Sequence, residues 1–212
     1  MMHNLSPENS VIKLYETPRT RSARCRWVLQ ELDVPFEAIQ VNLSQGEHRQ
    51  NEFLKLNPYG RVPVLVDDDV ILSESIAICL YLADKYKDRG IIPLPGTPER
   101  GIHDQWLLFC ATEMDQPLWQ IRRHTALYPV ELCLPEEVAI SRNNFKRAAD
   151  ILEAGLGSKS NLTNSGFTVV DIVITQTLIW AAGYGLLSDH SKLETYITHH
   201  KARNSCPKEL LS

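Results

Sequence analysis

Residues 57–75 read NPYGRVPVLVDDDVILSES, and this stretch carries the strongest structural signal in the chain. Two apolar runs, VPVLV at 62–66 and VIL at 70–72, flank three aspartates, which predicts a β-hairpin whose first strand begins at Val62. Pro63 is unexpected there, because proline cannot donate to a strand ladder and is confined to strand starts, edges and bulges. On composition alone a trans peptide bond before Pro63 is expected, since only ~5% of X–Pro bonds are cis.

The residues around this hairpin alternate between strand and helix patterns. Apolar residues recur at helical spacing in two segments, and two shorter segments alternate like strands. A polar loop with a short helix, ending at Pro58, precedes the hairpin. The order is therefore β-α-β-α-β-β-α, which predicts a mixed four-stranded sheet covered by helices over residues 11–87. The segments are VIKLY (11–15), SARCRWVLQEL (22–32), FEAIQVNL (36–43) and SIAICLYLADKY (75–86).

The pattern changes after a segment rich in proline and glycine. DRGIIPLPGTPER, which starts at residue 88, contains three prolines and two glycines, so we expect a linker over 88–98. From 99 to 212 only helical patterns follow, and one long helix over 99–123 is expected to bend at Pro117. The helix over 167–185 is apolar nearly all round, which predicts a buried central helix. Two further helices are predicted, PEEVAISRNNFKRAADILEAGLG (135–157) and SKLETYITHHKA (191–202), with the His199–His200 pair at the surface.

Composition excludes several classes of function. A net charge of −4 gives no electrostatic basis for binding nucleic acid. The five cysteines include no CxxC pair, which argues for reduced thiols and against a metal site. No apolar stretch approaches the ~18 residues that a membrane span requires. The start, MMHNLSPENS, lacks the apolar core of a signal peptide, so a cytoplasmic location is expected.

Two places in the sequence present polar groups at the start of a predicted helix. Ser75 lies where free backbone N–H groups attract a carboxylate, and Glu74 beside it suits an ammonium group. Thr20 and Ser22 lie at the turn before the helix that follows the first strand, where a hydroxyl can donate to a thiolate. Each hydroxyl also fits a simple helix cap, and from these residues alone both interpretations remain open.

Taken together, the hydroxyl-bearing turn, NPYGRVPVLVDDDVILSES and the helical half resemble the cytosolic glutathione transferases over about residues 11–206. The segment FTVVDIVITQTLIW supports this, because its Thr168 and Asp171 have the spacing of a capping box. The resemblance is to a serine/threonine-type, bacterial-like member. It implies a thioredoxin-like N-terminal domain, an all-helical C-terminal domain and a cis bond before Pro63.

The resemblance also implies roles for several residues of the glutathione site. The backbone of Val62 would pair with the cysteinyl part of glutathione, exposed by Pro63. Glu74 and Ser75 would hold the γ-glutamyl end. Lys55 is a candidate for the glycyl carboxylate, although a solvated surface lysine fits it nearly as well.

The catalytic hydroxyl has three candidates. Counting back four residues from Arg24 gives Thr20 where serine-type members have serine. Ser22 is the second candidate. Tyr15 is the third, because it lies eleven residues before Arg26, the spacing of tyrosine-type members. Cys25 falls on the apolar stripe of its helix and is interpreted as a core residue.

The resemblance implies a homodimeric enzyme with glutathione as cosubstrate and no metal. The glutathione thiolate would attack a hydrophobic electrophile or a peroxide, as in detoxification. The electrophile pocket would lie between the domains, with candidates Glu113, Trp119, Arg122 and Arg123. The two arginines would favour an anionic cosubstrate or simply form a solvated face. The alternative functions are a non-catalytic glutathione-binding or regulatory module and a thiol-disulfide or isomerase role.

Overall fold

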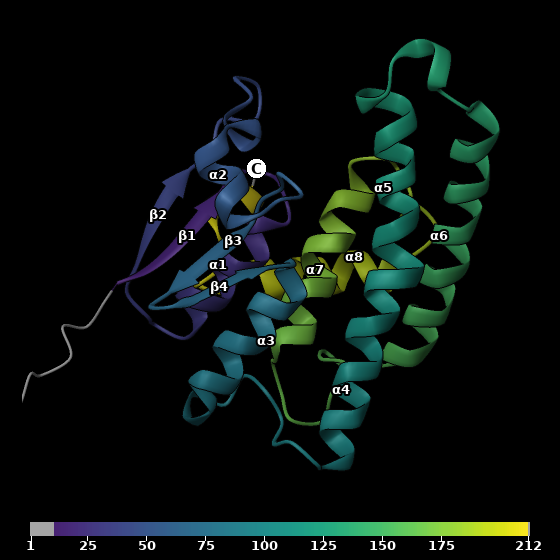
Figure 1. Cartoon of the computed structure of the whole chain (residues 1–212). Helices are drawn as coiled ribbons and strands as arrows, with labels where there is room; N and C mark the ends of the chain where they lie inside the picture. The colour runs from purple at the N-terminus through teal and green to yellow at the C-terminus, as the bar shows by residue number, and fades with distance from the viewer. Residues whose placement is uncertain (1–10, 212) are drawn as a thin grey trace, which may run out of the picture.

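The sheet is the element that the hairpin sequence predicts most directly. In the computed structural model, which describes residues 11–211, four strands lie in the order β2-β1-β3-β4 (Figure 1). β2 pairs with β1 in parallel, and β3 pairs with both β1 and β4 antiparallel, so the mixed four-stranded sheet is confirmed. The polar start at residues 1–10 lies outside the described residues. The strands are β1 Ile12–Glu16, β2 Phe36–Gln40, β3 Val64–Asp67 and β4 Val70–Ser73.

Two strand ends differ from the prediction by more than one residue. β3 begins at Val64 rather than Val62, because Pro63 has no N–H for the ladder and lies just before the first paired residue. β2 ends at Gln40 rather than Leu43. The side chain of Asn42 accepts hydrogen bonds from the N–H groups of the next residues and turns the chain there.

The alternation of side chains along the strands divides the apolar residues between the two faces of the sheet. Leu14 of β1 and Leu65 of β3 belong to the large core that includes helices α1 and α3. Their neighbours Tyr15 and Val64 belong to a smaller cluster with Phe53 of helix α2. Because successive side chains of a strand point to opposite faces, α1 and α3 cover one face and α2 covers the other.

The remainder of the described chain is helical. The segment 88–98, in which we propose the boundary between the two domains, leads from α3 to α4. Helices α4, α5, α6 and α7 form a bundle beside the sheet, and α1 and α3 lie between sheet and bundle (Figure 1). The helices are α1 Ser22–Glu31, α2 Asn51–Leu56, α3 Ser75–Lys85, α4 Pro98–Phe109, α5 Gln116–Arg122, α6 Pro135–Leu156, α7 Val169–Ala182 and α8 Ser191–Lys201.

The predicted long helix after the linker is helical but not uniform. A π-helical segment, Cys110–Asp115, separates α4 from α5, and a second one, Arg123–Leu127, follows α5. Pro117 lies in the first turn of α5. Proline cannot donate to the regular hydrogen-bond ladder of a helix. The wider π-helical turn just before Pro117 accommodates this interruption, at the residue where a bend is predicted.

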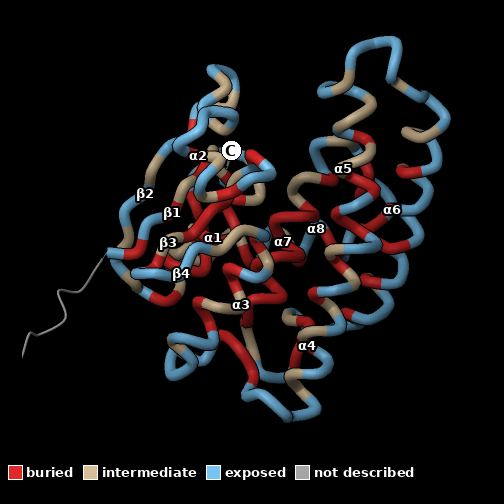
Figure 2. Tube along the Cα trace, viewed as in Figure 1, coloured by how far each residue is buried: buried red, intermediate tan, exposed pale blue. Residues whose placement is uncertain are grey.

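The central helix is α7. Its residues from Val169 to Leu178 are all buried, as Figure 2 shows at the middle of the molecule. Thr168 and Asp171 form the predicted capping box, with Asp171 Oδ2 accepting from the Thr168 N–H at 2.9 Å. Tyr196 of α8 binds the same carboxylate, because its hydroxyl donates to Asp171 Oδ1 at 2.6 Å, so the capping box also connects α7 to α8.

The histidine pair of α8 corrects one sequence prediction. His199 is exposed, but His200 is buried, with its ring 4.3 Å from that of Tyr196 and 5.1 Å from that of Phe167. Burial lowers the pKa of His200 to about 4. The helical period places the residue four positions after Tyr196 on the same buried face, so only the first histidine of the pair reaches solvent.

Gly155 of α6 provides a test of how closely the bundle is packed. A Cβ at this position would lie 2.4 Å from Cζ2 of Trp106 in α4, whereas one at Gly101 in α4 would meet nothing within 4 Å. We expect Gly155→Ala to lower the free energy of unfolding by about 1–3 kcal/mol through overpacking. Gly101→Ala, the control, should raise it by about 0.5–1 kcal/mol through helix propensity. Denaturant titrations measure both, and a stabilised Gly155→Ala protein would contradict the packing.

Candidate functional site

The turn between β1 and α1 holds the two hydroxyls singled out in the sequence. The Thr20 Oγ1 accepts a hydrogen bond from the N–H of Ser22 at 3.2 Å. It also lies 2.7 Å from the carbonyl oxygen of Thr17 and 2.9 Å from the Ser22 Oγ. A hydroxyl has one hydrogen, so it can serve only one of these two acceptors at a time. The Thr20 proton is therefore able to turn toward a third acceptor.

The other two candidates for the catalytic hydroxyl are less accessible or lie elsewhere. Ser22 is the first residue of α1, is 1% exposed and accepts from the Thr17 N–H at 3.3 Å. The Tyr15 ring packs against Phe53, with 6.2 Å between ring centroids, on the α2 face of the sheet. Cys25 is fully buried and burial raises the pKa of its thiol, which agrees with its interpretation as a core residue.

The loop before β3 contains the proline that the hairpin sequence left unexplained. The Val62–Pro63 bond is cis. Val62 is half-buried and pairs with no described strand. The loop is held by Asn57, whose side-chain amide donates to the Arg61 carbonyl at 2.8 Å. Gly60 has φ +60°, and a Cβ there would lie 2.8 Å from the carbonyl oxygen of His48, so this close approach requires glycine.

The start of α3 decides between two interpretations of Ser75. The N-cap residue is Glu74, without a side-chain capping bond, and Ser75 is the first residue of the helix. The simple-cap interpretation of Ser75 is therefore wrong. Glu74 has φ +71°, a strained conformation of the kind that clusters at functional sites, and its side chain is exposed. The first N–H groups of α3 have no partner within the helix, which suits an anion.

A buried ion pair connects these elements to the helical half. Both nitrogens of the Arg24 guanidinium fork bind Asp115, at 2.7 and 2.8 Å. Arg24 also donates to Gln176 and Thr177 of α7 at 2.7 Å, and its Nη1 lies 3.4 Å from the Ser75 Oγ. Burial opposes ionisation of Asp115, but the charge and hydrogen bonds of Arg24 outweigh it and lower the pKa of this carboxyl. Asp115 therefore stays ionised and fixes α1, α3 and α7 relative to one another.

Two arginines and two tryptophans lie against one another beside the Arg24–Asp115 ion pair. Arg21, between the two hydroxyl residues of the first turn, binds Asp115 at 3.0 Å. Its guanidinium carbon lies 5.6 Å from the ring centroid of Trp119 and 5.1 Å from that of Trp180. The guanidinium carbon of Arg61 lies 5.2 Å from the Trp119 centroid. These contacts place Trp119 of α5 against the first turn and the cis-proline loop.

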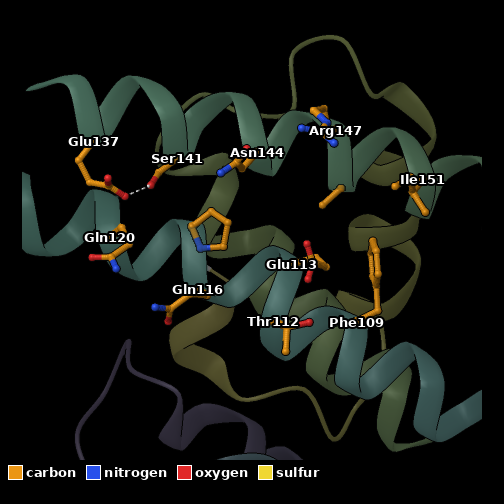
Figure 3. Close-up of a pocket in the computed structure, with 12 residues that line it drawn as sticks. Phe109, Thr112, Glu113, Gln116, Gln120, Glu137, Ser141, Asn144, Arg147 and Ile151 are labelled. Carbon is orange, nitrogen blue, oxygen red and sulfur yellow. Dashed lines mark hydrogen bonds between the residues drawn. The ribbon is translucent and has the colours of Figure 1, made fainter.

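The other electrophile-pocket candidates lie elsewhere. Arg122 is exposed, and the Arg123 guanidinium lies over the Tyr128 ring at 4.7 Å. Glu113 lines a separate groove of about 340 Å³ between α4, α5 and α6, which Figure 3 shows with Gln116 and Arg147 around it. The solvated-face interpretation therefore fits Arg122, and the arginines beside Trp119 are Arg21 and Arg61. Lys55 of α2 is exposed and pairs with Glu52 at 2.8 Å.

Sequence reasoning missed four residues near the site, which are Arg21, Arg61, Trp180 and His48. Arg21 follows Thr20 and Arg61 precedes Val62, and both neighbours are candidate site residues from the sequence. This adjacency is the signal that could have found the two arginines. The glycine of NPYG was the signal for His48, because that turn packs directly on it. The Nδ1 of His48 is buried and has no hydrogen-bond partner in the described part of the chain. Burial lowers the pKa of this imidazole, which favours its neutral form.

Within residues 11–211 no helix has both the length and the apolar character needed to cross a membrane. Within the same range no three His, Cys, Asp or Glu side chains gather as they would around a metal ion.

Comparisons with known proteins agree on one family. Residues 10–84 match the family model "Glutathione S-transferase, N-terminal domain", and residues 135–199 match "Glutathione S-transferase, C-terminal domain". Glutathione S-transferase F10 of Arabidopsis thaliana is 34% identical over 165 residues, which cover 76% of this chain and 77% of that protein. Glutathione S-transferase 1 of Schizosaccharomyces pombe is 37% identical over 148 residues, covering 68% and 64%.

A solved structure extends the likeness to nearly the whole chain. The glutathione transferase URE2P6 from Phanerochaete chrysosporium, in complex with oxidized glutathione, superposes with a TM-score of 0.84 at 28% identity and 96% coverage of both chains. With a thioredoxin-like sheet, a helical bundle and both family models matched, the chain belongs to the glutathione S-transferase family.

Proposed function

We propose that the chain binds reduced glutathione across the first turn, the cis-proline loop and the start of α3, and transfers it to an electrophile. One observation carries this proposal. Tyr15, Val64 and Ser73 lie opposite one another on β1, β3 and β4, which are neighbours in the sheet. Adjacent strands are about 4.8 Å apart. The first turn after β1, the cis-proline loop before β3 and the start of α3 after β4 therefore lie side by side at one end of these strands.

Each part of the tripeptide then has a chemically matched partner. The Glu74 carboxylate takes the γ-glutamyl ammonium group, and Ser75 with the free N–H groups of α3 takes the adjacent carboxylate. The Val62 backbone, unpaired by the described strands, takes the cysteinyl unit. For the glycyl carboxylate, His48 is better supported than Lys55, because Lys55 already pairs with Glu52.

The thiol is activated by a hydrogen bond and by charge. The Thr20 hydroxyl, held by the Ser22 N–H, donates to the sulfur and stabilises its anion. Arg21 and Arg24 share the single carboxylate Asp115, which leaves one positive charge beside the first turn. The thiolate attacks the electrophilic carbon, a carbon–sulfur bond forms and the leaving group departs with its electron pair. Attack on a peroxide oxygen would give the peroxidase side activity.

We also propose a homodimer in the cytoplasm. Several large apolar side chains of β4 and α4 are exposed, among them Ile71 at 48% and Leu108 at 65%, and Tyr59 of the cis-proline loop is 71% exposed. A second copy of the chain would cover such a surface. All five cysteines are free, which suits a reducing compartment. Sedimentation at micromolar concentration tests the dimer, and a monomer of 24.1 kDa would contradict it.

Glutathione binding tests the proposed site directly. Calorimetric titration should give saturable binding that weakens at least tenfold in Glu74→Gln, because the ammonium group of glutathione loses its charge-assisted bond. Glu131→Gln, an exposed residue far along the helical half, is the matched control and should bind as the unaltered protein does. No binding at millimolar glutathione would contradict the enzyme, and binding without turnover of any electrophile would favour the non-catalytic module.

A further inference from the structure

Tryptophan rings and guanidinium groups lie together beside the first turn and the cis-proline loop. Trp119 lies within cation–π distance of two arginines, Arg21 at 5.6 Å and Arg61 at 5.2 Å. Trp180 of α7 lies 5.1 Å from Arg21 and its ring centroid is 6.5 Å from that of Tyr184. The helical half therefore contributes flat aromatic surface, and the sheet half contributes cations.

The two arginines differ in how their charges are balanced. Arg21 forms an ion pair with Asp115, which it shares with Arg24. Arg61 is exposed and, among the residues the structure describes, pairs with no carboxylate; its guanidinium contacts only the Trp119 and Tyr59 rings. Arg21 and Arg24 thus share one carboxylate, and Arg61 holds a cation with no anion assigned to it.

The position of these groups connects them to the reaction. Arg21 directly follows Thr20, the proposed thiolate donor, and Arg61 directly precedes Val62, the proposed partner of the cysteinyl unit. Both side chains reach toward Trp119, so this ring lies beside both loops. An electrophile must come to these loops to meet the sulfur. A neutral occupant would cover the Arg61 guanidinium without replacing its lost water contacts, which costs free energy.

We propose that the electrophile of this enzyme is an aromatic compound that carries a carboxylate, with its ring against Trp119 and Trp180 and its carboxylate on Arg61. This inference rests on the proposed function and names the substrate class of the same site. The planar fork of arginine binds a carboxylate through two parallel hydrogen bonds, and tryptophan provides the largest face for an aromatic ring. Arg61 is then a determinant of substrate specificity rather than a residue of the bond-forming step.

A matched pair of aryl chlorides tests the inference. In 4-chloro-3,5-dinitrobenzoate and 4-chloro-3,5-dinitrobenzamide the thiolate attacks the carbon that bears chlorine, the carbon–sulfur bond forms and chloride leaves. The two compounds differ in charge and hardly in shape. Each kcat/KM is divided by the rate constant of the uncatalysed reaction with glutathione, which removes the difference in intrinsic reactivity. We expect the carboxylate to be preferred by about tenfold or more, the range of a charge-assisted hydrogen-bonded pair.

Arg61→Gln should abolish this preference, chiefly through the KM of the carboxylate, whereas Arg89→Gln, an exposed arginine of the linker region, should retain it. An unchanged preference in Arg61→Gln would overturn the inference. So would a rise in the KM for glutathione that is equal with both substrates, because Arg61 would then bind glutathione instead. Turnover of the amide without preference for the carboxylate overturns only the inference, whereas failure of the unaltered enzyme to bind glutathione overturns the proposed function itself.

Discussion

Replacing Thr20 with valine is expected to lower kcat about a hundredfold, because one preorganised donor to a developing anion is worth about 10²–10³ in rate. Valine has nearly the shape of threonine, so the turn keeps its packing and loses only the hydroxyl. The Thr20 Oγ1 is held by the Ser22 N–H at 3.2 Å, and its proton has two competing acceptors at 2.7 and 2.9 Å. The proton can therefore turn to the sulfur without rearrangement of the backbone.

The matched variant is Ser22→Ala. Ser22 is buried beneath Thr20 and contacts its hydroxyl at 2.9 Å, so we expect a loss of less than about tenfold, the effect of a group that only orients the donor. Steady-state rates with an aryl chloride under saturating glutathione measure both variants. A larger loss in Ser22→Ala than in Thr20→Val would assign the donor to Ser22, and a large loss in Tyr15→Phe alone would assign it to Tyr15.

Replacing Arg24 with methionine is expected to reduce the free energy of unfolding by about 3–5 kcal/mol, since its removal deprives a buried charge of its main partner. Arg24 is 0% exposed, and Asp115, its partner at 2.7 Å, is 5% exposed. Lys146→Met is the control, because Lys146 pairs with Asp189 at 2.8 Å in an exposed position. Water screens the charges of an exposed pair, so this control should lose far less stability than Arg24→Met.

The pH dependence gives this prediction a second signature. In the unaltered protein the pKa of Asp115 is lowered, so its contribution to stability is present above the pKa of an unfolded aspartate and is lost as the pH falls through the folded value. Without Arg24, Asp115 keeps Arg21 and Thr177 but loses the strongest of the groups that oppose the effect of burial, so its pKa rises. The deficit of Arg24→Met should therefore shrink as the pH falls and the carboxyl takes up a proton. A deficit that stays constant between pH 7 and pH 4, measured by denaturant titration, would contradict the role of this pair.

Local patterns predicted most of the fold. The hairpin, the capping box at Thr168 and Asp171 and the helix Pro135–Leu156 each depend on residues near in sequence, and each is present. The exceptions have physical reasons that act locally too. Pro63 delays the start of β3, and the Asn42 side chain ends β2 early.

The site was less predictable, because its contacts connect distant parts of the chain. Arg24 and Asp115 are 91 positions apart, and no local sequence pattern predicts their contact. The sequence offered Arg122 and Arg123 either as a pair facing the electrophile or as a solvated face, whereas the arginine side chains beside Trp119 are Arg21 and Arg61. Which residues face a space between two domains depends on how the domains dock, and helical periodicity does not contain that information.

The pKa of the glutathione thiol in the complex tests the central claim most directly. The thiolate absorbs in the ultraviolet and the thiol does not, so a pH titration of the difference spectrum between complex and separate components reports the ionisation. We predict a pKa at least one unit below the ~8.5 of a free thiol, and a return toward that value in Thr20→Val. A bound thiol with the pKa of free glutathione, in a complex that calorimetry shows to be saturated, would contradict activation by the first turn.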